Sequence, residues 1–340
     1  MSVYTIAEME IARGQLEFGT LPVGELRDGA TVSIPLMVMN GEHEGPTLWI
    51  DAAIHGVEIP GIDVIRRIMR EEVTPQDLRG TIVACPVLNP FAFRAGQNFS
   101  PIDEGTGNAD LHAVFPGSPD GGLNDRMAYR IFTEGIAKCD YYIDFHSNYY
   151  PAVEFIPITI CEDERVMDSS IKMAEAFGLP LSEVTGAHGW PIFNAQREGI
   201  PAMVVELLAH GYLDERSIQI GVTGTKNVLR HLGMLDGIPE PLSELKVEPG
   251  LYGRGFIYSK HGGLVHFNKT AGDWIATGEV IALIRNIYGD IVEEIMAPMQ
   301  GYIRTVLFGP HNEAVHGGGI IASVLEDDPE RKYFHDRKKR

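Results

Sequence analysis

The chain is poor in cysteine, in positive charge and in long apolar runs, and each shortage excludes a class of protein. Its cysteines, Cys85, Cys139 and Cys161, are widely spaced and form no CxxC pair. We therefore expect buried thiols in a reducing compartment, not a disulfide framework or a zinc knuckle.

Positive charge is also scarce: Lys and Arg number 28 against 47 Asp and Glu, which gives a net charge of −19. A surface of this charge repels nucleic-acid phosphates. No apolar stretch has membrane-spanning length, and charged residues interrupt the N-terminal region where a signal peptide would lie. We expect a soluble, cytoplasmic protein without a nucleic-acid or membrane partner.

The chain does contain a regular alternation of strand-like and helical patterns. Hydrophobic residues make up 44% of the sequence, enough for a substantial core. Strands are predicted at 47–54, 81–88, 141–147, 153–160 and 202–208, and helices at 60–73, 123–139, 164–179 and 223–235. Because these strands are apolar on both faces, we predict an α/β domain over residues 1–238, with short N-terminal strands and a mixed, mostly parallel sheet flanked by helices.

A proline-rich joint at 237–250 leads into a different pattern. Beyond it, short strands alternate with glycine turns, which predicts an all-β, barrel-like accessory domain at 239–328. Its hairpins resemble those of biotinyl and lipoyl carrier domains, but no lysine stands at a hairpin tip, so we expect no carrier function. Residues 329–340 form a run of charges and are predicted to be a solvated tail.

His55 and Glu58 follow the strand-like run that ends at Ile54 and precede the helical pattern that begins at Pro60. Loops at the carboxyl ends of sheet strands form the crevice in which α/β proteins bind ligands. A His-x-x-Glu pair on such a turn can present a nitrogen and a carboxylate oxygen to one cation, as zinc accepts. Taken alone, the pair also suits a capped helix entry with an incidental histidine.

Two further predicted strands carry titratable residues near their ends. His146 ends one of them, and Asp144, two residues earlier on the same face, can orient its imidazole. Glu206 lies in an otherwise apolar strand, where an unpaired carboxylate is costly to bury. Two histidines and a glutamate as ligands, with a second carboxylate as general base, form the donor set of a catalytic zinc site. We therefore predict His55, Glu58 and His146 as metal ligands and Glu206 as the base.

Together with "GPTLWIDAAIHGVEIPG", "LNPFAF", "SPID", "DL…FPG", "DFHSN" and "GIPAMVVEL", these residues resemble the succinylglutamate desuccinylase/aspartoacylase family, a branch of the zinc carboxypeptidase fold. The resemblance covers most of the chain, including the C-terminal β-domain. It implies that His55, Glu58 and His146 bind one zinc ion per chain and that Glu206 activates a zinc-bound water for attack on an amide carbonyl. The implied partner is a small N-acyl amine or N-acyl amino acid. The same donor set also suits iron and manganese.

The chain departs from the family pattern where the family binds substrate. Asn98, in "AGQNFSPID", stands where the family commonly has an arginine, and His112 and Ala113, in "DLHAVFPG", stand where it has an Asn-Arg pair that clamps a carboxylate. Alanine does not replace a bidentate guanidinium. Either the substrate lacks that carboxylate, or Arg94 or Arg126 of the same long loop (89–126) supplies the charge, or the protein binds without turnover. The candidate substrate-binding residues are Arg94, Asn98, His112 and Arg126.

The sequence is compatible with three functions. The first is a zinc-dependent amidohydrolase, and the second is a zinc carboxypeptidase on small peptides, which needs the cationic clamp that the loop lacks. The third is a non-catalytic metal- or ligand-binding relative, which Glu206 disfavours because a mere binder has no need of a buried carboxylate. A homo-oligomer is possible. His188 and His210 are weaker candidates for the site, and "HNEAVHGGG" at 311–319 has metal-like spacing but is expected to be a loop.

Overall fold

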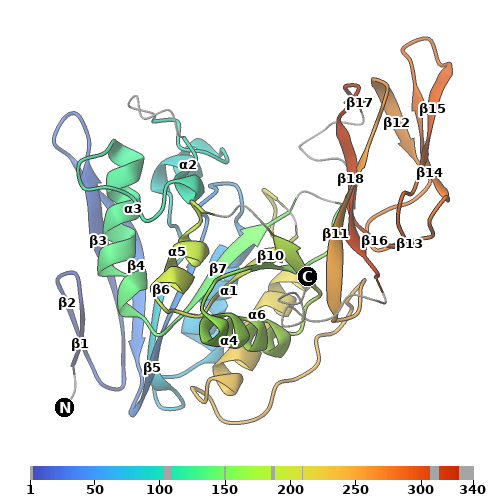
Figure 1. The fold of residues 1–340 in the computed structure, drawn as a ribbon. Helices are drawn as coiled ribbons and strands as arrows, with labels where there is room; N and C mark the ends of the chain where they lie inside the picture. The colour runs from blue at the N-terminus through green and yellow to red at the C-terminus, as the bar shows by residue number, and fades with distance from the viewer. Residues whose placement is uncertain are drawn as a thin grey trace.

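A mixed six-stranded sheet forms the centre of the N-terminal part of the chain (Figure 1). The structure, a computed structural model, describes residues 3–102, 109–148, 151–184, 188–208, 210–306 and 314–328. The strand order β10-β7-β5-β6-β4-β3 corresponds to Ala202–Leu207, Tyr141–Ser147, His43–Ala52, Arg79–Cys85, Thr31–Asn40 and Gln15–Glu25. Strands β10, β7, β5 and β6 are parallel, whereas β4 and β3 pair antiparallel. The carboxyl ends of β5, β7 and β10 therefore meet at one edge of the sheet.

Helices cover both faces of this sheet, as predicted. In β5, Leu48 and Ile50 pack into the core on one face, whereas Trp49 packs into the core on the other. This alternation follows from the strand period of two, and it explains why the strand is apolar throughout. The helices of the first face are α1 (Pro60–Arg67), α4 (Glu164–Phe177) and α6 (Glu215–His231), and those of the second are α3 (Leu123–Glu134) and α5 (Pro191–Arg197).

Three helices differ from the prediction, and for two of them, α6 and α2, the reason is a local helix cap. Helix α6 begins well before its predicted start because the Asp214 carboxylate accepts a hydrogen bond from the Ser217 N–H at 2.8 Å and so caps the helix. The segment 89–126, predicted as an irregular loop, contains the short helix α2 (Pro90–Ala95). Asn89 caps it and Pro90 occupies its first turn. Helix α5 was not predicted either.

Two further sheets form the C-terminal part of the chain. Their orders are β13-β16-β18-β11-β9-β8 and β15-β14-β12-β17. The C-terminal strands are β11 (Leu251–Tyr258), β12 (Gly263–Phe267), β13 (Trp274–Ile275), β14 (Val280–Arg285), β15 (Ile291–Met296), β16 (Gly301–Val306), β17 (Ala314–Val315) and β18 (Ile320–Glu326). Both sheets are open within the described residues, so the all-β prediction holds but the barrel is not closed.

The first of these sheets also takes strands from the N-terminal part. Strands β8 (Ile156–Thr159) and β9 (Leu181–Val184) are parallel, and β9 continues the sheet by pairing in parallel with β11. The predicted strand at 153–160 therefore belongs to this sheet and not to the central one. Backbone hydrogen bonds thus cross residue 238, the predicted boundary between the two domains.

The remaining described elements include an N-terminal hairpin of β1 (Val3–Ile6) and β2 (Met9–Ala12). No helix within the described ranges is both long and apolar enough to cross a membrane. The predicted charged tail, 329–340, lies outside the described residues.

Candidate metal centre

A tight turn after β5 carries His55 and Glu58 to the carboxyl edge of the sheet. The backbone of Ala53 takes a left-handed conformation (φ 53°), which redirects the chain at the strand end. The Glu58 N–H then donates to the His55 carbonyl at 3.0 Å. Gly56 is required between them, because a Cβ at this position would lie 2.1 Å from the backbone carbon of Ala92.

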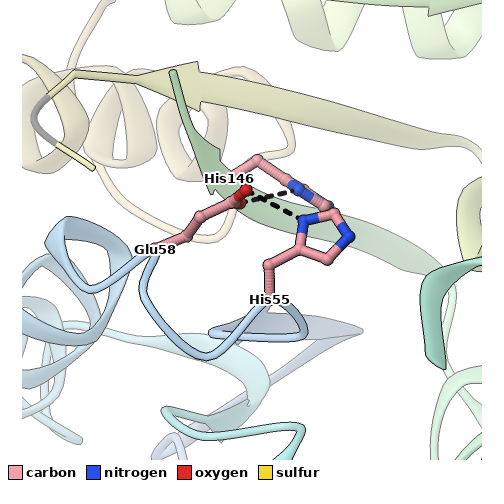
Figure 2. Close-up of side chains that lie close together, drawn as sticks. All are labelled: His55, Glu58 and His146. Carbon is pink, nitrogen blue, oxygen red and sulfur yellow. Dashed lines mark hydrogen bonds and ion pairs between the residues drawn. The ribbon is translucent and has the colours of Figure 1, made fainter. Parts of the chain in front are cut away.

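Glu58 lies between two imidazoles (Figure 2). Its Oε1 is 2.9 Å from His55 Nδ1, and its Oε2 is 2.9 Å from Nδ1 of His146, which projects from β7. The Ser147 N–H also donates to Oε2, at 3.1 Å. One potential ligand atom of each of these residues, His55, Glu58 and His146, lies within 4.8 Å of the others. The structure therefore brings the three predicted ligands together from two strand ends.

The charges in this cluster depend on one another. Burial opposes ionisation of Glu58, but His55 and His146 outweigh it and hold the pKa of its carboxyl well below the usual value. Burial also opposes protonation of His55, yet the negative charge of Glu58 and the contact with Asp110 raise its pKa to about 9. For His146, Asp144 and Glu58 overcome burial and raise the pKa. The pocket thus stabilises positive charge, which a cation can supply in place of the two protons.

Each imidazole is also held from its other side. Asp144 Oδ2 lies 3.1 Å from His146 Nε2, and Asp110 Oδ1 lies 3.4 Å from His55 Nε2. Both rings thus turn Nδ1 toward Glu58 and Nε2 toward a carboxylate, and the hydrogen bond between His146 and Asp144 is of the kind that fixes the tautomer of a metal-binding histidine. The structure places Asp144 beside His146 and Asp110, to which the sequence assigned no role, beside His55, and the orienting role of Asp144 stays a prediction.

The donor set fits a divalent first-row cation. Two imidazole nitrogens and one carboxylate are the protein ligands of many catalytic zinc sites, in which a further position stays open to water or substrate. The same set occurs with iron and manganese, so the donors define a class of cation and not one element.

Glu206 lies on β10, beside β7, the strand that carries His146. Its Oε2 accepts a hydrogen bond from Asn148 Nδ2 at 3.1 Å. Burial raises the pKa of its carboxyl, His146 opposes this effect, and Glu58 adds to it. The side chain nevertheless keeps partial exposure. A carboxylate that is desolvated but reachable, next to a metal site, suits a general base.

Aromatic rings of His112, Trp190 and Phe99 lie beside the candidate ligands. The ring of His112 lies 4.7 Å from that of His146 and 5.4 Å from that of His55. Trp190 stacks on His112 at 4.8 Å with an interplanar angle of 33°. Phe99 meets His55 edge-on at 5.8 Å. Burial, followed by the charges of His146 and His55, lowers the pKa of His112, so this ring is neutral where the family has an amide.

The other predicted substrate-binding residues have different surroundings. Asn98 is at the site, where its backbone carbonyl accepts a hydrogen bond from the Gly56 N–H at 3.2 Å. Arg94 is exposed in the last turn of α2. Arg126 is exposed on α3, and its Nε donates to the Gly121 carbonyl at 2.9 Å. It lines a cavity of about 730 Å³ between α3 and β3, and no metal-site residue lines that cavity. Substrate binding by the two arginines stays a prediction.

Of the weaker candidates, His210 lies next to the cluster, whereas His188 is exposed to solvent. His210 Nδ1 lies 4.0 Å from Glu58 Oε1, at the rim of the cluster. His188 is exposed and contacts Phe193 edge-on at 4.9 Å. Part of the 311–319 stretch, residues 311–313, lies outside the described residues, while β17 occupies Ala314–Val315.

Sequence reasoning also missed Asn148 and Trp190. Asn148 follows His146 by two positions, so its nearness could have been inferred from the same strand end. No local pattern places Trp190 on His112, because the two rings come from segments far apart in the sequence.

The fold and these residues define an α/β protein with a candidate mononuclear metal centre at the carboxyl edge of its sheet. Residues 44–232 match the succinylglutamate desuccinylase/aspartoacylase catalytic domain, and the chain belongs to this family, as its motifs predicted. Family members are amide hydrolases, or deacylases, which confirms the predicted class of enzyme.

Individual relatives resemble nearly the whole chain. The N-alpha-acetyl-L-2,4-diaminobutyric acid deacetylase of Halomonas elongata is 27% identical over 310 residues, which are 87% of this chain and 86% of that protein. The product-bound ectoine utilization protein EutE (DoeB) of Ruegeria pomeroyi is 26% identical, with a TM-score of 0.79 over 96% of this chain and 98% of that one. A Rhodobacter sphaeroides succinylglutamate desuccinylase/aspartoacylase, 24% identical, shares the fold with a TM-score of 0.81 over 95% and 99%.

Proposed function

We propose that this chain is a zinc-dependent deacylase that hydrolyses the amide bond of a small N-acyl amine or N-acyl amino acid. The observation that carries the proposal is the convergence of His55, Glu58 and His146 within 4.8 Å at the strand end next to Glu206. The family and its named deacetylase relative support amide hydrolysis as the reaction.

The chain's own residues divide the chemistry between them. A divalent cation held by His55, Glu58 and His146 would supply a Lewis acid that acidifies water and polarises the carbonyl. Glu206 takes the proton of the attacking water and delivers it to the leaving nitrogen. Because Asn148 donates to Oε2 of Glu206, the Oε1 atom is the one we assign to this transfer. The neutral ring of His112, packed on Trp190, forms a wall against the bound acyl compound.

The substrate that fits best has a cationic amine and does not depend on an arginine clamp. At the family clamp positions the chain has His112 and Ala113, and its net charge is −19. The Halomonas elongata relative acts, by its name, on an N-acetylated diamino acid. We therefore propose N-acetylated diamino compounds as the first class to test.

The deciding experiment measures amine release from a panel of substrates by the zinc-loaded protein. The panel contains N-acetyl diamino acids, N-acetyl monoamines and short peptides with a free carboxyl terminus. We expect hydrolysis of an N-acetyl compound, loss of activity on chelation, and recovery on adding zinc. Hydrolysis of the peptides alone would indicate a carboxypeptidase, and no hydrolysis of any member would contradict the proposal.

A further inference from the structure

One arginine of the C-terminal part, Arg304, reaches toward the proposed active site. It lies on β16, where the pairing with β18 shifts register between Ile303 and Thr305. Its side chain is only 3% exposed. A buried guanidinium requires hydrogen-bond and charge partners, because desolvating an unpaired charge is costly. The partners of Arg304 therefore indicate what this residue does.

Two of these partners belong to the segment that follows β7. Arg304 Nη1 donates to Asn148 Oδ1 at 3.2 Å, and its guanidinium lies 4.6 Å from the centre of the Phe155 ring. The backbone adds to this contact, since the Val153 N–H donates to the Arg304 carbonyl at 2.9 Å. Phe155 in turn exchanges backbone hydrogen bonds of 3.0 and 3.2 Å with Glu206. Asn148, Val153 and Phe155 thus link β16 to the strand that carries the base.

The Asn148 side chain connects the arginine to the base directly. Its oxygen accepts from Arg304, while its NH₂ group donates to Glu206 Oε2 at 3.1 Å. This arrangement has one orientation only. A flipped amide would set its NH₂ group against the guanidinium, which has no acceptor, and its oxygen against the carboxylate, which has no donor. Arg304 therefore fixes the Asn148 amide, and the amide fixes one oxygen of Glu206.

The electrostatics agree with this geometry. Burial, and then the charge of Arg254, lower the pKa of Arg304 to about 10, while Glu206 acts in the opposite direction. Arg304 thus remains a cation at neutral pH, and Glu206 is one of the groups that stabilise it. It is not suited to clamp a substrate carboxylate, because its side chain is buried and Nη1 is occupied by Asn148.

We infer that Arg304 is a positioning residue for Glu206: acting through Asn148, this residue of the C-terminal part sets the orientation of the catalytic base. The inference rests on the function proposed above. If the inference is right, residues 1–238, which carry the proposed ligands and base, need a residue of the C-terminal part to complete the active site. Proton transfer is sensitive to such placement, since a displacement of about 1 Å can cost on the order of 100-fold in rate.

The test compares Arg304→Met, Arg304→Lys and Asn148→Ala with wild type, and uses Arg285→Met as the control. Arg285 is an arginine of the same part of the chain whose Nη1 bonds to the Gly289 carbonyl in a hairpin. With a substrate that the wild type hydrolyses, we expect kcat to fall about 10- to 100-fold in Arg304→Met while KM stays within about twofold. Arg304→Lys should recover part of the loss, and the control should match wild type.

The double variant Arg304→Met/Asn148→Ala separates positioning from general destabilisation. If the two residues act as one chain of contacts, the double variant is no slower than the worse single one. Multiplicative losses, or a fall in kcat that follows only the fall in Tm or in metal content, would overturn the inference. If Arg304→Met fails to fold, the kcat values of Arg304→Lys, Asn148→Ala and their double variant are compared in the same way.

Crystal structures of wild type and of a folded Arg304 variant give a readout independent of turnover. We expect the Asn148–Glu206 hydrogen bond to be lost, and the Glu206 carboxylate to rotate, in Arg304→Met, and to a smaller extent in Arg304→Lys, whose ammonium can still donate to Asn148 Oδ1. An unchanged bond would overturn the inference even if the wild type proves to be a deacylase. A wild type that hydrolyses no N-acyl compound would overturn the proposed function alone, and the structures would still decide the positioning role.

Discussion

Glu206 and His146 are direct neighbours in the central sheet: their Cα atoms are register partners in the parallel pair of β10 and β7. The proposed base and one proposed ligand are thus placed by a backbone ladder and not by flexible loops. Side chains opposite one another in a sheet project from the same face. The separation of the proposed base from the proposed ligand is therefore determined by the register of the two strands.

The first prediction concerns Glu206→Gln. The amide keeps the shape of the side chain but cannot take a proton, so kcat should fall by about 10²- to 10⁴-fold. Zinc content, measured by elemental analysis, should stay at the wild-type value because Glu206 is not a ligand. A Gln variant with wild-type kcat would show that another group is the base.

The second prediction concerns the metal itself. Wild-type protein should contain about one zinc per chain, as a site of three protein ligands implies. His146→Ala should lose it, because only two ligands remain, and its Tm should no longer rise when zinc is added. His188→Ala, which alters an exposed histidine, is the control and should bind metal normally. Equal metal content in both variants would contradict the assigned site.

The third prediction tests the missing carboxylate clamp. Ala113 is exposed, so an arginine there can extend without entering the core. Ala113→Arg should lower KM about tenfold for N-acyl amino acids with a free carboxylate, equivalent to about 1.4 kcal/mol. It should leave KM unchanged for N-acyl amines without one. Ala113→Gln is the uncharged control, and an equal effect of Gln and Arg would exclude a charge-based clamp.

The fourth prediction concerns the turn that carries the ligands. Gly56→Ala places a Cβ 2.1 Å from the Ala92 backbone, so either the turn or α2 must move. We expect a loss of about 2 kcal/mol or more in the free energy of unfolding, together with weaker zinc binding, because His55 is the preceding residue. Gly250→Ala is the control, since its added Cβ comes no closer than 3.4 Å to the Tyr252 ring. Denaturant titration of both variants is the measurement.

The fifth prediction is a pH dependence. Burial, with a contribution from Asp140, raises the pKa of the Cys139 thiol to about 12. An unfolded chain loses this proton near pH 9, so between these values the unfolded state binds fewer protons and stability falls as pH rises. Cys139→Ser should reduce that decline by up to about 1.4 kcal/mol per pH unit above pH 9. Unfolding free energies at pH 8 and pH 10 are compared, and identical slopes would disprove the effect.

The sequence predicted those features that depend on local pattern. Apolar runs that end in His55 and His146 are enough to place both residues at the carboxyl edge, because parallel strands share that edge. The helix-flanked α/β sheet follows from the same alternation. The family followed from several motifs in fixed order, which no single His-x-x-Glu pair could indicate.

Features that depend on distant parts of the chain were not predictable in this way. Arg126 lies within the long loop 89–126 in sequence, and α3 places it in the lining of a cavity that no candidate metal ligand lines, a placement that the loop sequence did not indicate. Asn148 and Arg304 are 156 positions apart, and no periodicity in either segment indicates their contact. The domain predicted as barrel-like is all-β but does not close into a barrel within the described residues, and β8 and β9 extend a sheet that the local hairpin pattern assigned to the C-terminal residues alone.

The parallel pair of β9 and β11 also has a consequence for synthesis of the protein. Strand β9 is complete when Val184 leaves the ribosome, but the partner that covers its second edge begins only at Leu251. Until then a mostly buried strand has an open edge that can pair with another chain. We therefore expect a nascent chain to be prone to self-association until β11 is made, and a chain that ends before Leu251 to stay in that condition.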